Sequence, residues 1–138
     1  MSWSDHCIAA LAEAKLFENY GHKTRFKELL DCYADYPFFT KGLCKCMYLS
    51  AWDEDHFCIM LETLTDMSLG KETDTNDMRI QGDVLAEREP DAGYYVFQLS
   101  NAFLDNAPFQ LDENAQIDPV NMHIIRQALQ ASEIIDSI

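Results

Sequence analysis

Residues 44–58 read CKCMYLSAWDEDHFC, and they hold three of the five cysteines, one of the four histidines and three consecutive acids. Side chains of these types can bind a metal ion, or can supply a nucleophile and the base that activates it. Cys44, Cys46, His56 and Cys58 would form a four-ligand set of the kind that binds zinc. The competing interpretation is simpler: the stretch contains the beginning of a buried helix whose first turn is acidic.

Helical geometry argues against the metal interpretation. Residues two apart on an α-helix point about 200° apart, so neither Cys44 with Cys46 nor His56 with Cys58 could share one ion. Strands or loops would allow it, because residues i and i+2 share a face there. The spacing also differs from the C-x₂-C pattern of common zinc sites. We therefore expect no metal and no cofactor, and we interpret the cysteines as small core residues.

Nucleophilic catalysis also lacks support in the sequence. Cys58 is two positions from His56, and on a helix this spacing does not bring a nucleophile to its base. His123 stands beside two isoleucines, which favours a packing or surface histidine over a base. The chain contains no glycine-rich phosphate loop and no G-x-S-x-G or H-E-x-x-H motif. We predict no catalytic residue, and a protein that is not an enzyme is favoured over one that is.

The three consecutive acids have a structural explanation. Asp53, Glu54 and Asp55 could be paired catalytic carboxylates, but an acidic first turn of a helix explains them more simply. Negative charge near a helix N-terminus is stabilised by ~0.3–1 kcal/mol for each residue. Ser50 lies three positions before Asp53, which is the Ser-x-x-acid pattern of a capping box. We expect Ser50 to be the N-cap, so that Ser50→Ala would cost about 1 kcal/mol.

Negative charge is concentrated in one part of the chain, whose formal net charge is −14. Residues 1–50 contain six acidic and six basic residues, whereas residues 51–91 contain twelve acidic and three basic ones, a net charge of −9. A field of this sign repels nucleic acid and anionic membranes and attracts basic surfaces. The aromatic run at residues 94–97 has no Lys or Arg beside it, so we interpret it as core rather than as a platform for bases. We expect no direct binding to nucleic acid or to membranes.

This charge distribution predicts a protein-binding function. We expect a non-enzymatic module that binds a basic partner protein through the acidic surface of residues 51–91. Three alternatives stay open: an acidic surface that serves solubility alone, a small enzyme or metal-binding protein built on residues 44–58, and a homo-oligomeric structural protein. The sequence does not predict the oligomeric state. The candidate binding residues are eight of the acids: Asp53, Glu54, Asp55, Glu62, Asp66, Glu72, Asp74 and Asp77.

We expect a cytoplasmic protein of one domain. The first residues, MSWSDHCIAALAEAKLF, contain acids and lack the basic leader and apolar block of a signal peptide. The longest apolar runs, such as residues 57–61, are far shorter than the ~20 residues that span a bilayer. An odd number of cysteines argues against a disulfide framework. The length of 138 residues predicts a single helical domain over residues 1–138.

Composition and periodicity predict an all-α fold. Leu (14) and Ala (13) greatly outnumber Val (3), which favours helices over strands. We expect an irregular bundle of six or seven helices, with one short strand pair near residues 71–91 as the competing prediction for that stretch. The predicted helices cover about residues 4–20, 25–36, 41–49, 51–67, 77–87, 93–104 and 119–135.

Local signals predict the ends of several helices and the burial of one. Gly21 is expected to cap the first helix, and Thr24 to start the second. Asp118-Pro119 is a start signal, with an acid at the N-cap and proline at the first helical position. The element GYYVFQLSNAFL has apolar residues around nearly its whole axis, so we expect it to be the central helix. The last helix is expected to face the core with Ile125, Ala128, Leu129, Ser132 and Ile135.

Three phrases occur in the order RFKELL (residues 25–30), YLSAWDEDHF (48–57) and VFQLSNAFL (96–104). In this order of elements the chain resembles small uncharacterised proteins carried on bacterial mobile elements and in gut anaerobes. The likeness rests on apolar phrases and includes no catalytic motif. It implies a bacterial source, and it implies no activity, cofactor or partner.

Overall fold

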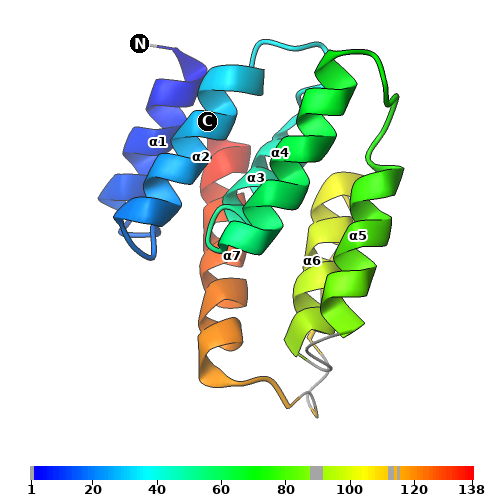
Figure 1. The fold of residues 1–138 in the computed structure, drawn as a ribbon. Coiled ribbons are helices and arrows are strands. Elements are labelled where there is room, and N and C mark those ends of the chain that lie inside the picture. The colour runs from blue at the N-terminus through cyan, green and yellow to red at the C-terminus, as the bar shows by residue number, and fades with distance from the viewer. Residues whose placement is uncertain (1, 88–91, 112–113, 115) are drawn as a thin grey trace.

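The computed structural model describes residues 2–87, 92–111, 114 and 116–138, without the side chains of residues 77, 92 and 93. Within this part of the chain the secondary structure consists of seven helices and no strand (Figure 1), so the all-α prediction is confirmed. The strand pair near residues 71–91 is wrong where that stretch is described, because residues 76–87 form a helix. The helices are α1 (Trp3–Glu13), α2 (Tyr20–Tyr33), α3 (Lys41–Ser50), α4 (Glu54–Ser68), α5 (Asn76–Glu87), α6 (Ala92–Asp105) and α7 (Pro119–Ser137).

Helix α3 lies at the centre of the bundle and packs against α2, α4, α6 and α7. Every residue from 43 to 49 is buried. In Figure 1, α1 and α2 stand on one side of α3 and the α5–α6 pair stands on the other. The prediction that the sixth helix is the central one is wrong, because α6 buries a single stripe and exposes Tyr94. The buried stripe of α6 consists of Val96, Leu99 and Phe103.

Central burial of α3 requires partners for its polar side chains. The ammonium group of buried Lys45 is 2.8 Å from the Asp136 carboxylate of α7. The Cys46 thiol is 3.0 Å from the Ser100 hydroxyl of α6. Burial raises the pKa of the Cys46 thiol, so the sulfur stays protonated. Helices α6 and α7 therefore supply polar as well as apolar contacts to α3.

A buried histidine joins α2 to α3. The Nε2–H of His22 donates to the Tyr48 carbonyl at 2.8 Å, and its Nδ1 accepts the Glu18 backbone N–H at 3.1 Å. These two partners select the neutral tautomer, and burial lowers the pKa of His22 below its ordinary value of 6.5. The Tyr48 hydroxyl donates to the Leu16 carbonyl, so the loop between α1 and α2 is held against α3. The rings of two further residues pack around His22 and Tyr48: Phe17 and Phe26.

Helix α1 is shorter than predicted, and α2 begins earlier. Helix α1 ends at Glu13 rather than near residue 20, and Lys15 takes a left-handed φ of 59° where the chain turns. Asn19 is the N-cap of α2, and its side-chain oxygen accepts the His22 N–H at 2.8 Å. The two predicted caps are wrong because both lie inside α2: Gly21 and Thr24.

The boundary between α3 and α4 also differs from the prediction. Ser50 is the last residue of α3, whereas Asp53 is the N-cap of α4 and accepts the His56 N–H at 3.2 Å. Arg25 holds the intervening turn, because its guanidinium donates to the carbonyls of residues 51–52 at 2.6 and 3.2 Å. Both Ser50 and Asp53 are favourable N-cap types. In the structure Asp53 is the N-cap, and the contacts of Arg25 hold the turn that separates Ser50 from it.

The start of α7 is predicted correctly. Asp118 is the N-cap, its carboxylate accepts the Asn121 N–H at 3.1 Å, and Pro119 is the first helical residue. The inner stripe is partly correct, since two of its five predicted members are only half-buried: Leu129 and Ser132. The buried residues of α7 are Ile124, Ile125, Ala128, Ala131 and Ile135. Pro90 and Asp91, which precede the sixth helix in the sequence, lie outside the described residues.

Gly42 marks a close approach of α3 to α6, and substitution there should be costly. A Cβ at this position would lie well inside van der Waals contact of the Phe103 carbonyl oxygen. We expect Gly42→Ala to lower the free energy of unfolding by about 1–3 kcal/mol through overpacking. Gly82→Ala is the matched control, because its Cβ would meet only the Phe97 ring, at 3.3 Å. Urea denaturation would compare the two, and equal effects would contradict the close packing of α3 on α6.

The environment of His22 makes stability depend on pH. Because burial lowers the pKa of His22, the unfolded chain binds a proton more readily than the folded protein below about pH 6.5. The free energy of unfolding should therefore be highest above this pH and should fall as the pH drops toward the folded-state pKa. Urea denaturation measures the free energy of unfolding at about pH 7.5 and at about pH 5.5. The difference between the two values should be smaller for His22→Gln than for the wild type. His6→Gln, at an exposed position, should leave this difference unchanged. If His6→Gln reduced the difference as much as His22→Gln, His22 would not be the cause of the pH dependence.

Candidate functional site

The described acids of residues 51–87 lie at the N-cap of α4, along α4, in the loop that follows it and on α5. Of the eight candidate residues, those with exposed side chains are Glu54, Asp55, Glu62 and Asp74. Those that are half-buried are Asp53, Asp66 and Glu72. The side chain of Asp77 lies outside the described residues. Glu54 and Asp66 are twelve positions apart on one helix, which places them ~18 Å apart, so these acids do not converge on one ion.

One face of α4 carries an acidic stripe. Asp55, Ile59, Glu62 and Asp66 follow the i, i+4, i+7, i+11 spacing that places side chains on the same side of a helix. Ile59 is the apolar member of this stripe and is half-buried. Helix α5 packs against α4, so the stripe borders the junction of the two helices.

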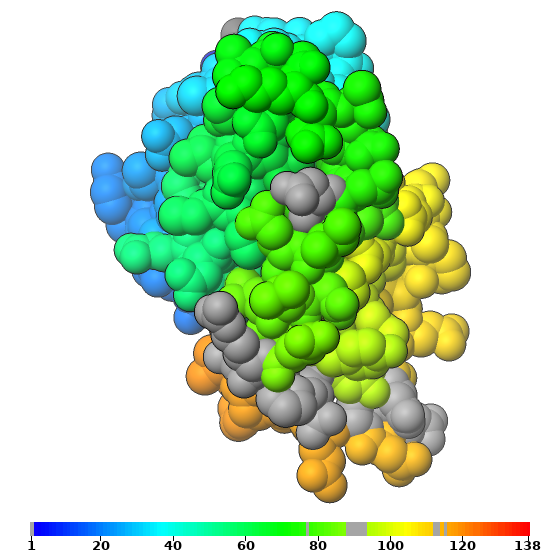
Figure 2. All heavy atoms as spheres, turned by 45° about the vertical axis from the view of Figure 1, so that its right-hand side comes forward, coloured from blue at the N-terminus to red at the C-terminus, as the bar shows by residue number. Residues whose placement is uncertain are grey.

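A groove of about 320 Å³ lies between α4 and α5, on the face of the molecule that Figure 2 shows. Ile80 and Val84 are one turn apart on α5, and they are 64% and 51% exposed. Apolar side chains gathered in a hollow and exposed to water are typical of an interaction site. The groove is lined by Asp55, Ile59, Ile80, Gln81, Val84 and Leu85.

Little of the negative charge near the groove is neutralised within the described chain. Among the described acids of residues 51–87, Asp53 is the one that forms an ion pair, with His56. Arg79 of α5 binds the Asp105 carboxylate through hydrogen bonds of 3.0 and 2.6 Å, so its positive charge is already compensated. A basic group that entered the groove would therefore meet carboxylates that form no ion pair with any of the described residues.

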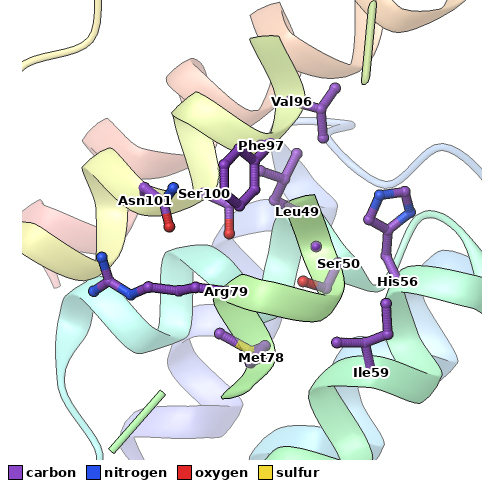
Figure 3. A pocket seen from close by; sticks show the side chains of 11 residues that line it. Leu49, Ser50, His56, Ile59, Met78, Arg79, Val96, Phe97, Ser100 and Asn101 are labelled. Atoms are coloured by element: carbon purple, nitrogen blue, oxygen red, sulfur yellow. The ribbon is translucent and has the colours of Figure 1, made fainter. Parts of the chain in front are cut away.

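Ile59 also lines a second, smaller pocket of about 40 Å³, which reaches toward α3 and α6 (Figure 3). Figure 3 places His56 on one side of this pocket, and Arg79 and Asn101 on the opposite side. Its volume corresponds to roughly two or three water molecules. Pockets that enclose small-molecule ligands usually measure ~300–1,000 Å³. The polar residues of its wall are Ser50, His56, Arg79, Ser100 and Asn101.

Asp53 and His56 form the pair that most resembles catalytic machinery. The Asp53 Oδ2 lies 2.5 Å from the His56 Nδ1, and the Trp52 ring stacks on the imidazole with 5.6 Å between centroids. The hydrogen bond from His56 lowers the pKa of Asp53, which keeps it a carboxylate. Such a carboxylate can orient a histidine that acts as a base.

The cysteines and histidine of residues 44–58 are not gathered in space. Cys44 and Cys46 are buried on α3, Cys58 is exposed on α4, and His56 lies at the wall of the small pocket. A hydrogen bond with Cys7, together with burial, raises the pKa of Cys44 well above its usual value, so this thiol is unreactive. Within the part of the chain that the structure describes, no three His, Cys, Asp or Glu side chains are placed to hold a metal ion together.

The apolar lining of the groove is absent from the sequence-predicted residues. Helix α5 buries Met78 and Ala86 against the core. Ile80 and Val84 lie off this face and form an exposed i, i+4 pair. One apolar stripe is enough to pack a helix against a core. A second apolar pair outside the stripe is therefore the signal that could have identified the groove.

The comparisons with known proteins identify no family. No protein-family model, no curated protein and no solved structure matches the chain. The resemblance to small bacterial proteins of mobile elements stays a prediction. No helix within the described residues combines the length and the apolar character needed to cross a bilayer.

The capping role of Asp53 can be tested against the sequence prediction. Asp53→Ala should lower the free energy of unfolding by about 1 kcal/mol, because it removes the acceptor for the His56 N–H. Ser50→Ala should cost less, since Ser50 ends α3 and caps no helix. Asp53→Asn should keep most of the stability, because asparagine is an equally good N-cap. Chemical denaturation measures the free energy of unfolding of all three variants. A larger loss for Ser50→Ala than for Asp53→Ala would indicate that Ser50, rather than Asp53, is the N-cap.

Proposed function

We propose that this protein is a non-enzymatic binding module that engages a basic partner protein through the acidic surface of residues 51–91. The observation that supports this most directly is the α4–α5 groove, where exposed Ile80 and Val84 lie beside Asp55. Apolar surface contributes ~25 cal/mol for each Å² that a partner buries. The surrounding acids select a basic partner and speed its association. An acidic surface that served solubility alone would not require two apolar side chains in its midst.

A small enzyme built on Asp53 and His56 is the weaker proposal. The pocket beside His56 measures about 40 Å³ and would have to widen before a substrate could enter. The Asp53 carboxylate already has a structural role, because it caps α4. We place the module in the cytoplasm as part of the same proposal, since all five cysteines are free thiols.

Neutralising the exposed acids of α4 tests the proposed function. The test variant combines Glu54→Gln, Asp55→Asn and Glu62→Gln. The matched control removes three exposed acids that lie outside this surface: Glu13→Gln, Glu28→Gln and Asp35→Asn. Immobilised wild-type protein should capture basic proteins at low salt and release them as ionic strength rises. The test variant should lose this capture, and the control should retain it.

Folding must be verified before these captures are compared. Acids in the first turn of α4 stabilise the helix by ~0.3–1 kcal/mol each, so circular dichroism should establish that both variants are folded. Mass spectrometry would then compare the captured proteins. Equal capture by wild type, test variant and control would overturn the proposal, and so would capture that high salt leaves unchanged.

A further inference from the structure

Resting on the proposed function, we infer that the α4–α5 groove receives a basic amphipathic α-helix of the partner protein. The apolar face of that helix covers Ile80 and Val84, and its Lys and Arg side chains lie against the flanking acids. The inference specifies the secondary structure of the bound segment, its basic charge and its docking position. The assignment follows from the geometry of the groove, from the composition of its lining and from the charges around it.

A helix fits this groove better than the other common forms of a bound segment. A partner strand gains affinity by pairing with the edge of a sheet, and the described residues contain no strand. A proline-rich segment docks in grooves lined by aromatic rings, whereas this lining contains Ile, Val and Leu and no aromatic residue. An amphipathic helix requires an apolar groove between helices, which is what α4 and α5 form.

The dimensions of the groove match the side chains of a docked helix. Ile80 and Val84 are four positions apart on α5, which corresponds to ~6 Å along the helix axis. Rows of residues spaced by four on one helix pack into the grooves between such rows on another. The volume of about 320 Å³ admits apolar anchor side chains, while the body of the partner helix stays above the surface.

The charges on both sides of the groove specify a basic helix. Asp55 belongs to the lining, and Glu62 extends the acidic stripe along α4. On α5, exposed Asp83 and Glu87 follow Ile80 and Val84 by three positions each, so each acid flanks one of the apolar residues. Lys and Arg side chains can lay their apolar stems on the groove while their charged ends reach these carboxylates.

The same charges oppose the pairing of this groove with the same groove of a second copy of the chain. The protein carries a net charge of −14, and the described residues 51–87 present acids on both helices of the groove. Two such grooves brought face to face would place like charges together, which opposes association. The charges therefore favour a partner of opposite charge.

Three synthetic peptides test this inference. The first is a helix of leucine and lysine, with leucine at i, i+3, i+4 and i+7 and a side-chain bridge that maintains helicity. The second has the same composition in scrambled order, and the third is oligolysine of the same net charge. Fluorescence anisotropy should show that wild-type protein binds the first peptide at least about ten-fold more tightly than the other two, because only that peptide buries a continuous apolar face.

Matched variants locate the binding position. Ile80→Ser with Val84→Ser should weaken binding of the amphipathic peptide by about ten-fold or more. Val120→Ser is the control, because Val120 is also 64% exposed but lies on α7. That variant should bind like the wild type. Because these side chains face solvent, circular dichroism should show that both variants fold.

The outcomes separate this inference from the proposed function. Equal affinity for the three peptides, or unchanged affinity after Ile80→Ser with Val84→Ser, would overturn helix docking in the groove. If acid neutralisation on α4 still abolished capture of basic proteins, the proposed function would stand without the groove. If the acid-neutralised variant bound all three peptides as tightly as the wild type, both proposals would fail.

Discussion

Between residues 43 and 49, α3 has no side that faces water, although this segment contains a lysine, two cysteines and a tyrosine. Burying these groups without partners would cost free energy that a domain of this size cannot spare. Each of their partners comes from another element: Asp136 of α7 for Lys45, Ser100 of α6 for Cys46. The Tyr48 hydroxyl donates to the Leu16 carbonyl in the loop after α1. The polar groups of one helix therefore determine how three other segments are placed.

Helices α4 and α5 are positioned indirectly by this arrangement. The guanidinium of Arg25 on α2 holds the turn between α3 and α4, and the Tyr33 hydroxyl of α2 lies 2.8 Å from the Thr65 hydroxyl of α4. The ion pair of Arg79 with Asp105 ties α5 to α6. Neither α4 nor α5 contacts α7, which lies on the far side of α3. They are left at the periphery with one face toward water, and the groove with its acids belongs to that face.

The sequence predicted well those features that local chemistry determines. The start of α7 depends on Asp118 and Pro119 alone, and the structure has it as predicted. The N-cap of α4 was assigned to Ser50 because Ser50 and Asp53 match the pattern of a capping box. Asp53 is an equally suitable N-cap residue, and the turn before it is held by Arg25, which lies 26 residues before Ala51 in the sequence. The central position of α3 was missed because its polar residues look exposed until their distant partners are known. The second apolar pair on α5 indicates an additional apolar face, but the groove itself depends on how α4 packs beside that face, which the sequence does not show.

The uncompensated acids on α4 would affect the free protein and the proposed complex in opposite ways. Glu62 and Asp66 are four positions apart on one face, and like charges at this spacing destabilise a helix by ~0.2–0.5 kcal/mol. Salt screens this repulsion and so stabilises the free protein slightly, whereas it weakens attraction to a basic partner. A basic helix in the groove would relieve the same repulsion while gaining its own attraction to these carboxylates. Surface charge that lowers the stability of the free protein would therefore add to the affinity of the proposed complex, which is the physical reason to expect the acids and the groove to act as one site.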